Sequence, residues 1–568
     1  MITDSSQVET ERLRTDFVSF QNRAGLRIAA CWDRPDASLQ PRPWVLVAPK
    51  YGETKKNNLH LAYYLAANGA NVLRFDQTNH VGESEGRMED FTLPGAVEDI
   101  VSCLDYLEGN FGVTQAVVVS NSLSARCALR AAVRDARVTK LISVAGVVNL
   151  QATLREVYRE DIFGTYLAGR HWGITDILGF DINGESFLGT AVAAQLHDLA
   201  GTIGDVKQLR VPLVYFYAER DTWVDSREVA EALDGNPQCR RVLVQSAMHE
   251  VRENPRAAEA VFRQVVWASL RDDPYNEAKP FRLRVPGKKL VLQQNRLERE
   301  RMRRAETPDK ENEFWSGYLK KYSVLEKSTD YRAYLDLVGR LCGPLAPGAL
   351  VLDAGCGNGM LGLWILREAW RRNAFSAAVA PLVYVGLDLT AQGLSDALGH
   401  HLHLRHNPGP AARPDLMALP GLQYSLVDFD QMEERGSAGG QLAFRDGTFD
   451  VACCSLVLSY LQRPQRLLQE LHRVLRPGGT LVASSMKPHC DMSVIYRDFI
   501  GQQVTAGELE AARNLLRAAG RIKLKEEIGY YAFFSQTELA GLVTAAGFNI
   551  QEAHHSLGDQ AVVVKATR

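Results

Sequence analysis

The first half of the chain alternates short apolar, β-branched runs with longer segments of helical periodicity. The apolar runs lie at residues 44–48, 71–75, 116–120, 141–144 and 213–218. Strands that are apolar along their whole length are typical of parallel sheets buried on both faces, and the intervening helical segments supply the covering layers. The pattern therefore predicts a mostly parallel sheet with helices on both faces.

The second half starts this alternation again instead of extending it. Apolar runs recur at residues 349–353, 383–387, 424–427, 449–455 and 480–484. A new series of this kind indicates a second sheet with its own core, and 568 residues are too many for a single core. The sequence predicts two doubly wound α/β domains.

Two segments interrupt the alternation. Between residues 147 and 209 the strand signal lapses in a stretch rich in Leu, Phe, Tyr and Trp, which predicts an inserted lid. Residues 295–309 (NRLERERMRRAETPD) have helical character, with opposite charges four residues apart at Glu300 and Arg304. The interleaved acids favour a solvated linker over an RNA-binding arm. We place the boundary near residue 305, which gives domains 1–305 and 306–568.

Composition narrows the class of protein. Hydrophobic residues make up 46% and charged residues 23%, as in soluble globular proteins, and a net charge of -2 provides no field for nucleic acid. Small molecules or a protein carrier are the expected partners. No signal-like or membrane-spanning apolar run is found, which predicts a cytoplasmic protein without a membrane span.

The cysteines and histidines indicate neither a disulfide framework nor a metal site. Nine cysteines lie at scattered positions without a CxxC pair, which favours reduced thiols. One histidine cluster, GHHLHLRH, has no cysteine or carboxylate beside it, so solvated histidines are favoured over metal ligands. The cluster comprises His400, His401, His403 and His406.

A serine nucleophile is predicted at Ser122. A nucleophile on a strand-to-helix turn needs small residues two positions before and after it, because the tight turn brings these positions against neighbouring backbone. Ser122 follows the apolar run AVVV and has Ser120 and Ser124 at the two positions. The glycines of GxSxG are absent, so this motif alone is weak.

An acid and a histidine follow Ser122 in the chain order of α/β-hydrolase triads. Asp221 directly follows the apolar run LVYFYAER, and His249 lies 28 residues further on. In this interpretation His249 accepts the proton of Ser122, and Asp221 orients the imidazole. The backbone amides of Leu123 and Tyr51 are the expected oxyanion donors.

A second acid and base occur in FDQTNHVGESEG. They are Asp76 and His80, which precede the serine and lie in the loop after an early strand. This position favours a structural role over a catalytic one.

Four segments together give a specific resemblance. VVNL after the fifth strand, SNSLSAR at the serine, FDQTNHVGESEG and ERDTWVD resemble the bacterial luminescence acyl-transferases, which are myristoyl-carrier-protein thioesterases. The resemblance covers roughly residues 15–303 and implies an α/β-hydrolase fold. It also implies an acyl thioester of acyl-carrier protein or CoA as substrate, with release to water or another acceptor. At the turn that carries the serine, the family has Ala-x-Ser-x-Ser, whereas this chain has Ser120 in place of the alanine. The loop PKYGETKKNN also differs from the family. These differences leave the acyl chain length and the acyl acceptor open.

A glycine-rich loop opens the second series of strands. An apolar strand runs into D-x-G-x-G-x-G, which comprises Asp353, Gly355, Gly357 and Gly359. Alternate glycines let the backbone approach a ligand closely at the carboxyl end of a strand, where open α/β sheets bind ligands. Dinucleotide enzymes use such a loop too, so the residues that follow it decide the class of ligand.

Those residues suit an adenosyl group. Asp388 ends the next apolar run and can accept hydrogen bonds from both ribose hydroxyls, while Asp428 and Phe429 suit the amino group and the face of an adenine. Ser455 closes RDGTFDVACCS, and LHRVLRPGGTLVASS follows it. The array resembles the class I methyltransferases of the ubiquinone and menaquinone methylase type over roughly residues 310–568. The resemblance implies a Rossmann-like fold, S-adenosyl-L-methionine as cofactor, and a small-molecule or fatty-acyl methyl acceptor.

Some features of this half stay open. Asp388 lies 33 residues beyond Gly355, against about 20 in dinucleotide folds, and REAWRRNAFSAAVAPL would account for the difference as a longer helix and loop. His489 is a lone candidate base for the methyl acceptor. An aromatic helical stripe fits a core and a cofactor lid equally well: Trp315, Tyr318 and Tyr322.

Two functions remain. The first is a bifunctional enzyme that releases or transfers an acyl group through the serine site and methylates the acyl product or a related metabolite. The second is a methyltransferase whose hydrolase-like half binds acyl-carrier protein without turnover. A purely scaffolding protein would leave both ordered residue sets unexplained.

Overall fold

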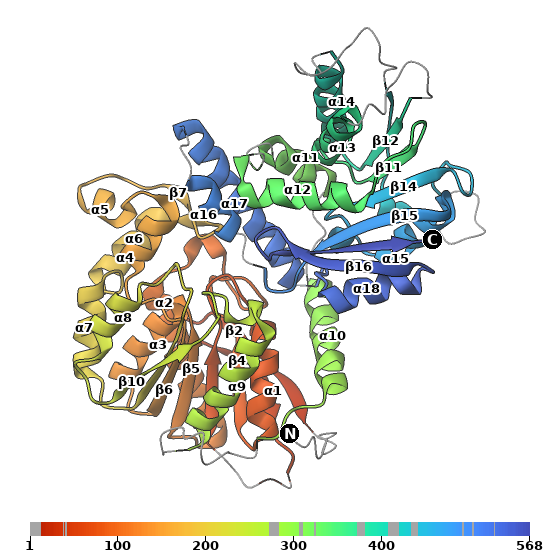
Figure 1. Cartoon of the computed structure of the whole chain (residues 1–568). Coiled ribbons are helices and arrows are strands. Elements are labelled where there is room, and N and C mark those ends of the chain that lie inside the picture. The colour runs from red at the N-terminus through yellow and green to blue at the C-terminus, as the bar shows by residue number, and fades with distance from the viewer. Residues whose placement is uncertain are drawn as a thin grey trace. The chain divides into compact units, whose positions relative to one another are not determined.

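The computed structural model describes residues 13–37, 39, 43–271, 283–305, 311–322, 325, 327–371, 381–406, 420–432, 441–490, 493–501, 505–527 and 529–568. The chain forms two compact units (Figure 1). The first unit comprises Met1–Glu306 with Gly520–Gly529, and the second comprises Thr307–Ala519 with Tyr530–Arg568.

The first unit is built on an eight-stranded sheet in the order β1-β2-β4-β3-β5-β6-β9-β10. The strands are β1 (Arg14–Gln21), β2 (Arg27–Arg34), β3 (Trp44–Ala48), β4 (Asn71–Phe75), β5 (Ala116–Asn121), β6 (Val138–Val144), β9 (Leu213–Ala218) and β10 (Cys239–Val244). β1 and β2 pair antiparallel, β2 pairs antiparallel with β4, and the pairs from β4 to β10 are parallel. The sheet is therefore mostly parallel, as predicted.

Helices cover both faces of this sheet. α1 (Leu59–Ala67) and α9 (Pro255–Leu270) pack together on one face, and α2 (Leu93–Phe111), α3 (Leu123–Arg134) and α8 (Ser226–Leu233) lie on the other (Figure 1). Alternate residues of β3 serve the two layers: Val45 and Val47 join the core cluster under α1 and α9, and Leu46, also fully buried, faces the opposite layer.

The segment between β6 and β9 is an insertion of mixed structure. It contains α4 (Leu150–Tyr158), α5 (Ile162–Leu167), β7 (Ile174–Ile177), β8 (Phe180–Asn183), α6 (Gly184–Ala193) and α7 (Leu199–Gln208). β7 and β8 form a separate antiparallel hairpin, which the lapse in strand signal did not predict. Asn149, Asp161 and Asn183 cap the first turns of α4, α5 and α6, which explains where these helices begin.

The charged tract after the first sheet is not a solvated linker up to Ala305. It forms α10 (Lys288–Ala305), which belongs to the first unit and buries Glu298 and Met302. Glu300 pairs with Arg296 at 2.9 Å, and the side chain of Arg304 lies outside the described residues. Residues 306–309 of the tract lie outside the described residues.

The second unit contains a seven-stranded sheet in the order β13-β12-β11-β14-β15-β17-β16. Its strands are β11 (Leu350–Ala354), β12 (Val383–Asp388), β13 (Gly421–Leu426), β14 (Phe449–Cys454), β15 (Leu475–Met486), β16 (Asn549–Ser556) and β17 (Ala561–Thr567). β17 pairs antiparallel with both β15 and β16, and the remaining pairs are parallel. The strand order reverses at β11, whose carboxyl end is therefore a topological switch point where ligands bind.

Helices flank this sheet as well. They are α11 (Glu311–Tyr322), α12 (Thr329–Leu341), α13 (Met360–Arg371), α14 (Ala391–His406), α15 (Pro464–Val474), α16 (Ser493–Ile500) and α18 (Gln536–Ala545). A further helix, α17 (Ala506–Glu527), belongs to the second unit up to Ala519 and to the first unit from Gly520. The core under α15 and α18 combines Leu467, Leu471 and Val543 with the apolar faces of the strands. The predicted class, two doubly wound α/β domains, is confirmed.

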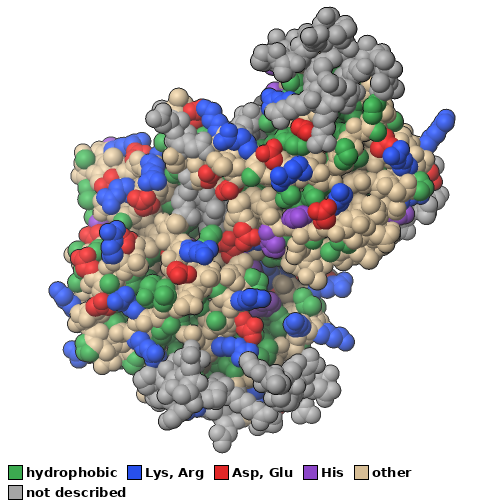
Figure 2. Space-filling view, in the orientation of Figure 1, with side chains coloured by type: hydrophobic (Ala, Val, Ile, Leu, Met, Phe, Trp, Pro, Cys, Tyr) green, Lys and Arg blue, Asp and Glu red, His purple; other side chains and the backbone are tan. Residues whose placement is uncertain are grey.

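The structure also locates the charged side chains and the cysteines. On the face shown in Figure 2, acidic and basic side chains are interspersed among the described residues. All nine cysteines are described and none forms a disulfide. Among the described residues, no helix is long and apolar enough to span a membrane, and no group of His, Cys, Asp and Glu could hold a metal ion.

Candidate active sites

Ser122 occupies the tight turn between β5 and α3. Its φ of 51° and ψ of -126° lie outside the regions that non-glycine residues usually adopt, and the Ser122 N–H donates to the Val144 carbonyl at 3.0 Å. Such strain is found at functional sites that the surrounding structure holds in place. The side chain is nearly buried, with 6% of the residue surface exposed.

The flanking serines explain why this turn needs small residues. Ser120 is completely buried between β5 and β6, where its Oγ approaches the Ile142 carbonyl at 3.4 Å. Ser124 Oγ donates to the Asn121 carbonyl at 2.8 Å within the turn itself. A larger side chain at either position would collide with this backbone.

The three triad residues predicted from sequence lie within hydrogen-bond distance of one another. Ser122 Oγ lies 2.8 Å from His249 Nε2, and His249 Nδ1 lies 2.9 Å from Asp221 Oδ2. Asp221 Oδ1 accepts hydrogen bonds from the backbone N–H groups of Trp223 and Val224 at 2.8 and 3.1 Å. The arrangement can remove a proton from Ser122 and stabilise the imidazolium that forms.

The electrostatics of Asp221 suit an ionised partner of the imidazole. Burial alone would raise the pKa of Asp221, but the charge and hydrogen bond of His249 and the two backbone donors outweigh burial and lower it. Trp223 is a residue that sequence reasoning missed. It stacks on the His249 ring, and its place two residues after Asp221 in ERDTWVD was the available signal.

The two expected oxyanion donors lie in different elements. Leu123 is the first residue of α3, and Tyr51 lies in the loop after β3, where its hydroxyl donates to the Ile177 carbonyl at 2.9 Å. Among the described residues, neither the Leu123 nor the Tyr51 backbone N–H has a hydrogen-bond acceptor. The amide at the start of α3 also benefits from the positive end of the helix dipole.

A pocket opens beside Ser122 and His249. The loop after β3 contributes Lys50 and Glu53, and the apolar lining includes Leu61 from α1 and Val261, Phe262 and Val265 from α9. None of the lining residues belongs to the insertion at 147–209.

Charged pairs join the loop after β3 to the residues that follow His249. Lys50 Nζ lies 3.0 Å from Glu250 Oε2, and Arg252 pairs with both Glu250 and Glu53. Burial would raise the pKa of Glu250, but Arg252 and Lys50 outweigh it and lower the pKa well below its usual range. These ion pairs hold the two segments together, and both segments line the pocket.

Asp76 and His80 have structural contacts, as expected. His80 Nε2 accepts a hydrogen bond from the Gly52 N–H at 3.0 Å, and burial lowers the pKa of His80 to about 3, so its ring is neutral. Asp76 is fully buried and pairs with Lys55 at 2.5 Å. Neither is hydrogen-bonded to Ser122 or His249 in the described residues.

In the second unit, the glycine-rich loop lies at the carboxyl end of β11. Gly355, Gly357 and Gly359 all have positive φ, at 86°, 52° and 83°. A Cβ at Gly355 would lie 2.1 Å from Val457 Cγ2, and one at Gly359 would lie 2.7 Å from the Cβ of Ala397. Both the conformation and the close approach of neighbouring chain therefore require glycine at these positions.

Two aspartates support this loop. Asp388 Oδ2 accepts a hydrogen bond from the Gly357 N–H at 2.8 Å, and its Oδ1 accepts from Thr390. Asp353 Oδ2 accepts from the Tyr384 hydroxyl at 2.7 Å, while its buried Oδ1 has no partner in the described residues. Burial raises the pKa of Asp353 to about 7, with Tyr384 opposing and Asp388 adding to the rise.

The remaining predicted cofactor residues differ in exposure. Asp428 is exposed and caps a short turn, whereas the Phe429 ring is buried in the core cluster of the second sheet. Ser455 Oγ lies 2.6 Å from the Tyr334 hydroxyl, which also contacts Ser484 Oγ at 2.7 Å. His489 lies in the turn after β15 with a φ of 60°.

The histidine cluster corrects the sequence interpretation at His401, whereas His403 is exposed as predicted and the side chain of His406 lies outside the described residues. His401 is 1% exposed, and its Nε2 lies 2.7 Å from the Gly359 carbonyl while its Nδ1 lies 2.6 Å from the Tyr424 hydroxyl. His400 Nδ1 contacts the Asn358 carbonyl at 2.9 Å. Both histidines hold the glycine-rich loop, because α14 passes directly beside it, and only His401 is buried.

The aromatic stripe lies on α11, which packs close to the same loop. A Cβ at Gly357 would lie 3.2 Å from Leu319 Cδ2 of this helix. The Trp315 ring packs on Tyr460 with centroids 4.6 Å apart, and Tyr318 is buried. The side chain of Tyr322 and residues 372–380 of the predicted longer helix and loop lie outside the described residues.

Comparison with known proteins decides the identity of the two regions. The family described as acyl transferase matches residues 30–270, and the family described as methyltransferase domain matches residues 327–553. The chain joins an acyl transferase domain to a methyltransferase domain. The predicted resemblance is thereby confirmed for both halves.

Several curated relatives match the acyl transferase domain. An acyl transferase of Photobacterium phosphoreum is 28% identical over 234 residues, which is 40% of this chain and 75% of the relative. One of Aliivibrio fischeri (strain MJ11) is 29% identical over 231 residues, covering 40% of this chain and 74% of the relative. Among solved structures, Est1E of Butyrivibrio proteoclasticus with ferulic acid bound is 16% identical, with a TM-score of 0.38 and coverage of 44% of this chain and 98% of that chain.

Proposed function

We propose that the chain is a bifunctional enzyme that releases or transfers an acyl group from an acyl-carrier protein or CoA thioester and transfers a methyl group to the acyl product or a related metabolite. The hydrogen-bonded series Ser122, His249 and Asp221, at 2.8 and 2.9 Å with Ser122 held at positive φ, carries the proposal. Binding a carrier without turnover does not require a serine that is held in a strained conformation and hydrogen-bonded to a histidine base.

The acyl-transfer step follows from this geometry. Ser122 Oγ attacks the thioester carbonyl carbon while His249 Nε2 takes the hydroxyl proton. The C–S bond breaks, the departing thiolate takes that proton from His249, and an acyl ester remains on Ser122. The acceptor, water or another hydroxyl, loses a proton to His249 as it attacks this ester. The bond between the acyl carbon and Ser122 Oγ then breaks, and Ser122 Oγ takes that proton from His249. The amides of Leu123 and Tyr51 are the proposed donors to the oxyanion.

The second site fits S-adenosylmethionine. The three glycines give the loop at the carboxyl end of β11 its positive-φ course, and Asp353 offers a buried oxygen without a partner in the described residues. When bound, this cofactor supplies a methyl group on a positively charged sulfur. We expect Asp388 to accept the ribose hydroxyls, and the other proposed contacts are Asp428, Phe429 and Ser455.

Labelling with a fluorophosphonate tests the acyl-transfer half against the binding-only alternative. We expect one covalent adduct, located by peptide mass spectrometry at Ser122, and none in Ser122→Ala. Ser124→Ala is the matched control and should still label, because in the described residues the Ser124 hydroxyl bonds only to the backbone of Asn121 in the same turn. An unlabelled wild-type protein that still binds S-adenosylmethionine would favour a methyltransferase with a non-catalytic acyl-carrier-binding domain.

The fusion favours a shared substrate, since joining two sites in one chain raises their effective mutual concentration. We propose that methylation occurs on the acyl thioester or on the acid that Ser122 releases. Long-chain acyl-carrier protein with labelled S-adenosylmethionine distinguishes the two orders. Methylated free product from wild type but not from Ser122→Ala supports release first, and a methylated thioester on the variant supports the reverse. Label on an unrelated small molecule alone would exclude the shared substrate.

A further inference from the structure

The loop that carries Tyr51 is buried although it is rich in charge. Glu53, Thr54 and Lys55 are 1%, 0% and 2% exposed, and η1 (Lys55–Asn58) follows directly. A buried loop must satisfy its backbone and charged groups internally. The contacts that do so determine where this loop lies.

The backbone of Lys55 is held on both sides. Its N–H donates to Asp76 Oδ1 at 2.6 Å, and its carbonyl accepts from Arg74 Nη1 at 3.0 Å. Its ammonium group donates to Asp76 Oδ2 at 2.5 Å and to Glu83 Oε2 at 2.7 Å. Lys55 thus fixes the end of the loop that begins after β3.

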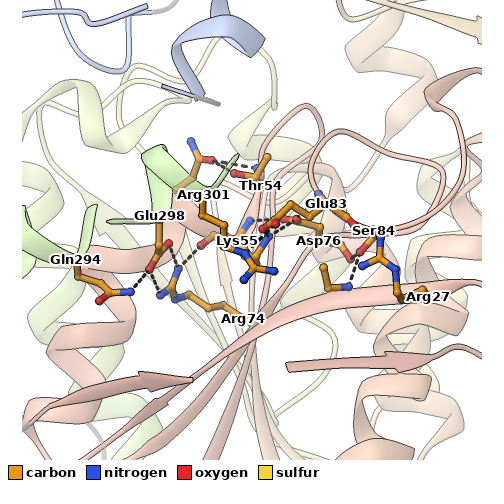
Figure 3. A network of polar contacts seen from close by, with 12 residues as sticks. Arg27, Thr54, Lys55, Arg74, Asp76, Glu83, Ser84, Gln294, Glu298 and Arg301 are labelled. Carbon is orange, nitrogen blue, oxygen red and sulfur yellow. Dashed lines mark hydrogen bonds and ion pairs between the residues drawn. The ribbon is translucent and has the colours of Figure 1, made fainter. Parts of the chain in front are cut away.

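Arg74 uses all five of its N–H donors, and Figure 3 shows its guanidinium beside Glu298. Its Nε and Nη2 donate to Asp33 at 2.6 and 3.0 Å, and its Nη1 and Nη2 donate to Glu298 at 2.7 and 2.6 Å. The fifth hydrogen bond is the one to the Lys55 carbonyl. A guanidinium has five N–H donors in a rigid plane, so fixing four of them fixes the direction of the fifth.

One of the two anions that fix Arg74 comes from α10. Glu298 is 2% exposed, and Gln294 Nε2 on the same helix donates to its Oε1 at 2.9 Å. One turn further on, Arg301 pairs with Glu83 at 2.9 Å and so supports the Lys55 side of the network (Figure 3). Burial would raise the pKa of Glu298, but the charge of Arg74 outweighs it and lowers the pKa, so Glu298 is ionised.

Stability alone does not account for these charges. Buried ion pairs are costly to desolvate, and well-packed apolar side chains of similar volume often hold a helix equally well. What apolar residues cannot supply is a directed hydrogen bond to the Lys55 carbonyl. The buried ion pairs of Arg74 therefore direct a hydrogen bond to the loop whose Tyr51 amide is a proposed oxyanion donor.

We propose that Glu298 is a positioning residue for acyl transfer, which acts through Arg74 on the loop that carries Tyr51. The inference rests on the proposed reaction at Ser122. An oxyanion donor stabilises charge that develops in the transition state, so displacing the loop lowers kcat and leaves the KM of the thioester nearly unchanged.

The test compares Glu298→Gln with Glu300→Gln in the full chain. Glu300 lies on the exposed side of the same helix and pairs only with Arg296 in the described residues, so it is a matched control. With acyl-CoA as substrate, we expect Glu298→Gln to lower kcat about 10-fold to 100-fold, as for a misplaced catalytic group, with KM within about twofold. Glu298→Asp, which keeps the charge, should restore part of kcat. Glu300→Gln should match wild type.

Each outcome has a defined meaning. If wild type has no Ser122-dependent turnover, the proposed function fails whatever Glu298 does. Suppose that turnover depends on Ser122. The positioning proposal is then overturned if Glu298→Gln retains wild-type kcat, if it raises KM alone, or if it loses activity only because it unfolds at the assay temperature. If Glu298→Gln does not fold, Glu298→Asp carries the test, and a wild-type kcat in that variant with faster amide exchange confined to α10 would overturn it.

Discussion

The indole ring of Trp223 lies parallel to the imidazole of His249, with ring centroids 5.1 Å apart and planes 7° apart. The Trp223 carbonyl also accepts a hydrogen bond from Thr153 Oγ1 at 2.9 Å, which ties this segment to α4. Stacking of this kind restricts the imidazole to the plane in which it meets both Ser122 and Asp221.

We therefore predict that Trp223→Ala lowers kcat for thioester hydrolysis. An aromatic contact is worth about 0.5–1.5 kcal/mol, so the loss should be roughly twofold to tenfold, and Trp223→Phe should recover most of it. Steady-state kinetics on acyl-CoA would check this. Equal kcat in wild type and Trp223→Ala would show that the hydrogen bonds alone orient the ring.

A second prediction concerns Asp388 at the end of β12. Asp388→Ala should weaken S-adenosylmethionine binding by about 1.5–3 kcal/mol, the range for hydrogen bonds to a charged group. The Gly357 N–H loses its acceptor in the same variant, which adds to the effect. Calorimetric titration measures the change, and thioester hydrolysis by the same variant is the control that should stay at the wild-type rate. An unchanged Kd would remove Asp388 from the ribose site.

A third prediction follows from His401. Burial lowers the pKa of His401 from its usual value near 6.5 to about 4, with the Gly359 carbonyl opposing this. Between these two values the unfolded chain binds more protons than the folded one, so this contribution to stability is complete above pH 6.5 and is lost as the pH falls toward 4. Binding of S-adenosylmethionine should raise the midpoint temperature of one unfolding transition, which identifies the transition of the second unit. The midpoint temperature of that transition should fall as the pH is lowered.

The matched variants for this prediction lie on α14. His401→Gln removes the titration, so its transition should fall less than that of wild type between pH 7 and 5. His403→Gln, at an exposed position of the same helix, should behave as wild type. Parallel pH profiles for wild type and His401→Gln in scanning calorimetry would refute the assignment.

The strands that sequence predicted best are those buried on both faces. β3, β4 and β9 begin and end where the apolar runs do, because each run is bounded by polar or turn-forming residues. β1 was not predicted, since it has only alternate residues partly buried and therefore no continuous apolar run. β17 was missed although it is apolar, because nothing local indicates that the chain re-enters the sheet antiparallel between β15 and β16.

The triad could be proposed from sequence because order and spacing along the chain constrain it. The role of Glu298 could not, since its partner Arg74 lies 224 residues earlier and α10 reads locally as a charged surface helix. His401 was likewise read as solvated. Its two partners are a backbone carbonyl 42 residues earlier and the Tyr424 hydroxyl on another element, and neither contact can be inferred from the local sequence.

The most direct test of the central claim is the mass of the protein after rapid mixing with an acyl thioester and acid quenching. The account predicts an adduct of one acyl group, mapped to Ser122, which forms in wild type at a rate at least equal to turnover. Ser122→Ala should form no adduct and should lose several orders of magnitude in thioester hydrolysis, while it still binds S-adenosylmethionine. Hydrolysis at the wild-type rate by Ser122→Ala, or an acyl group mapped to another residue, would contradict it.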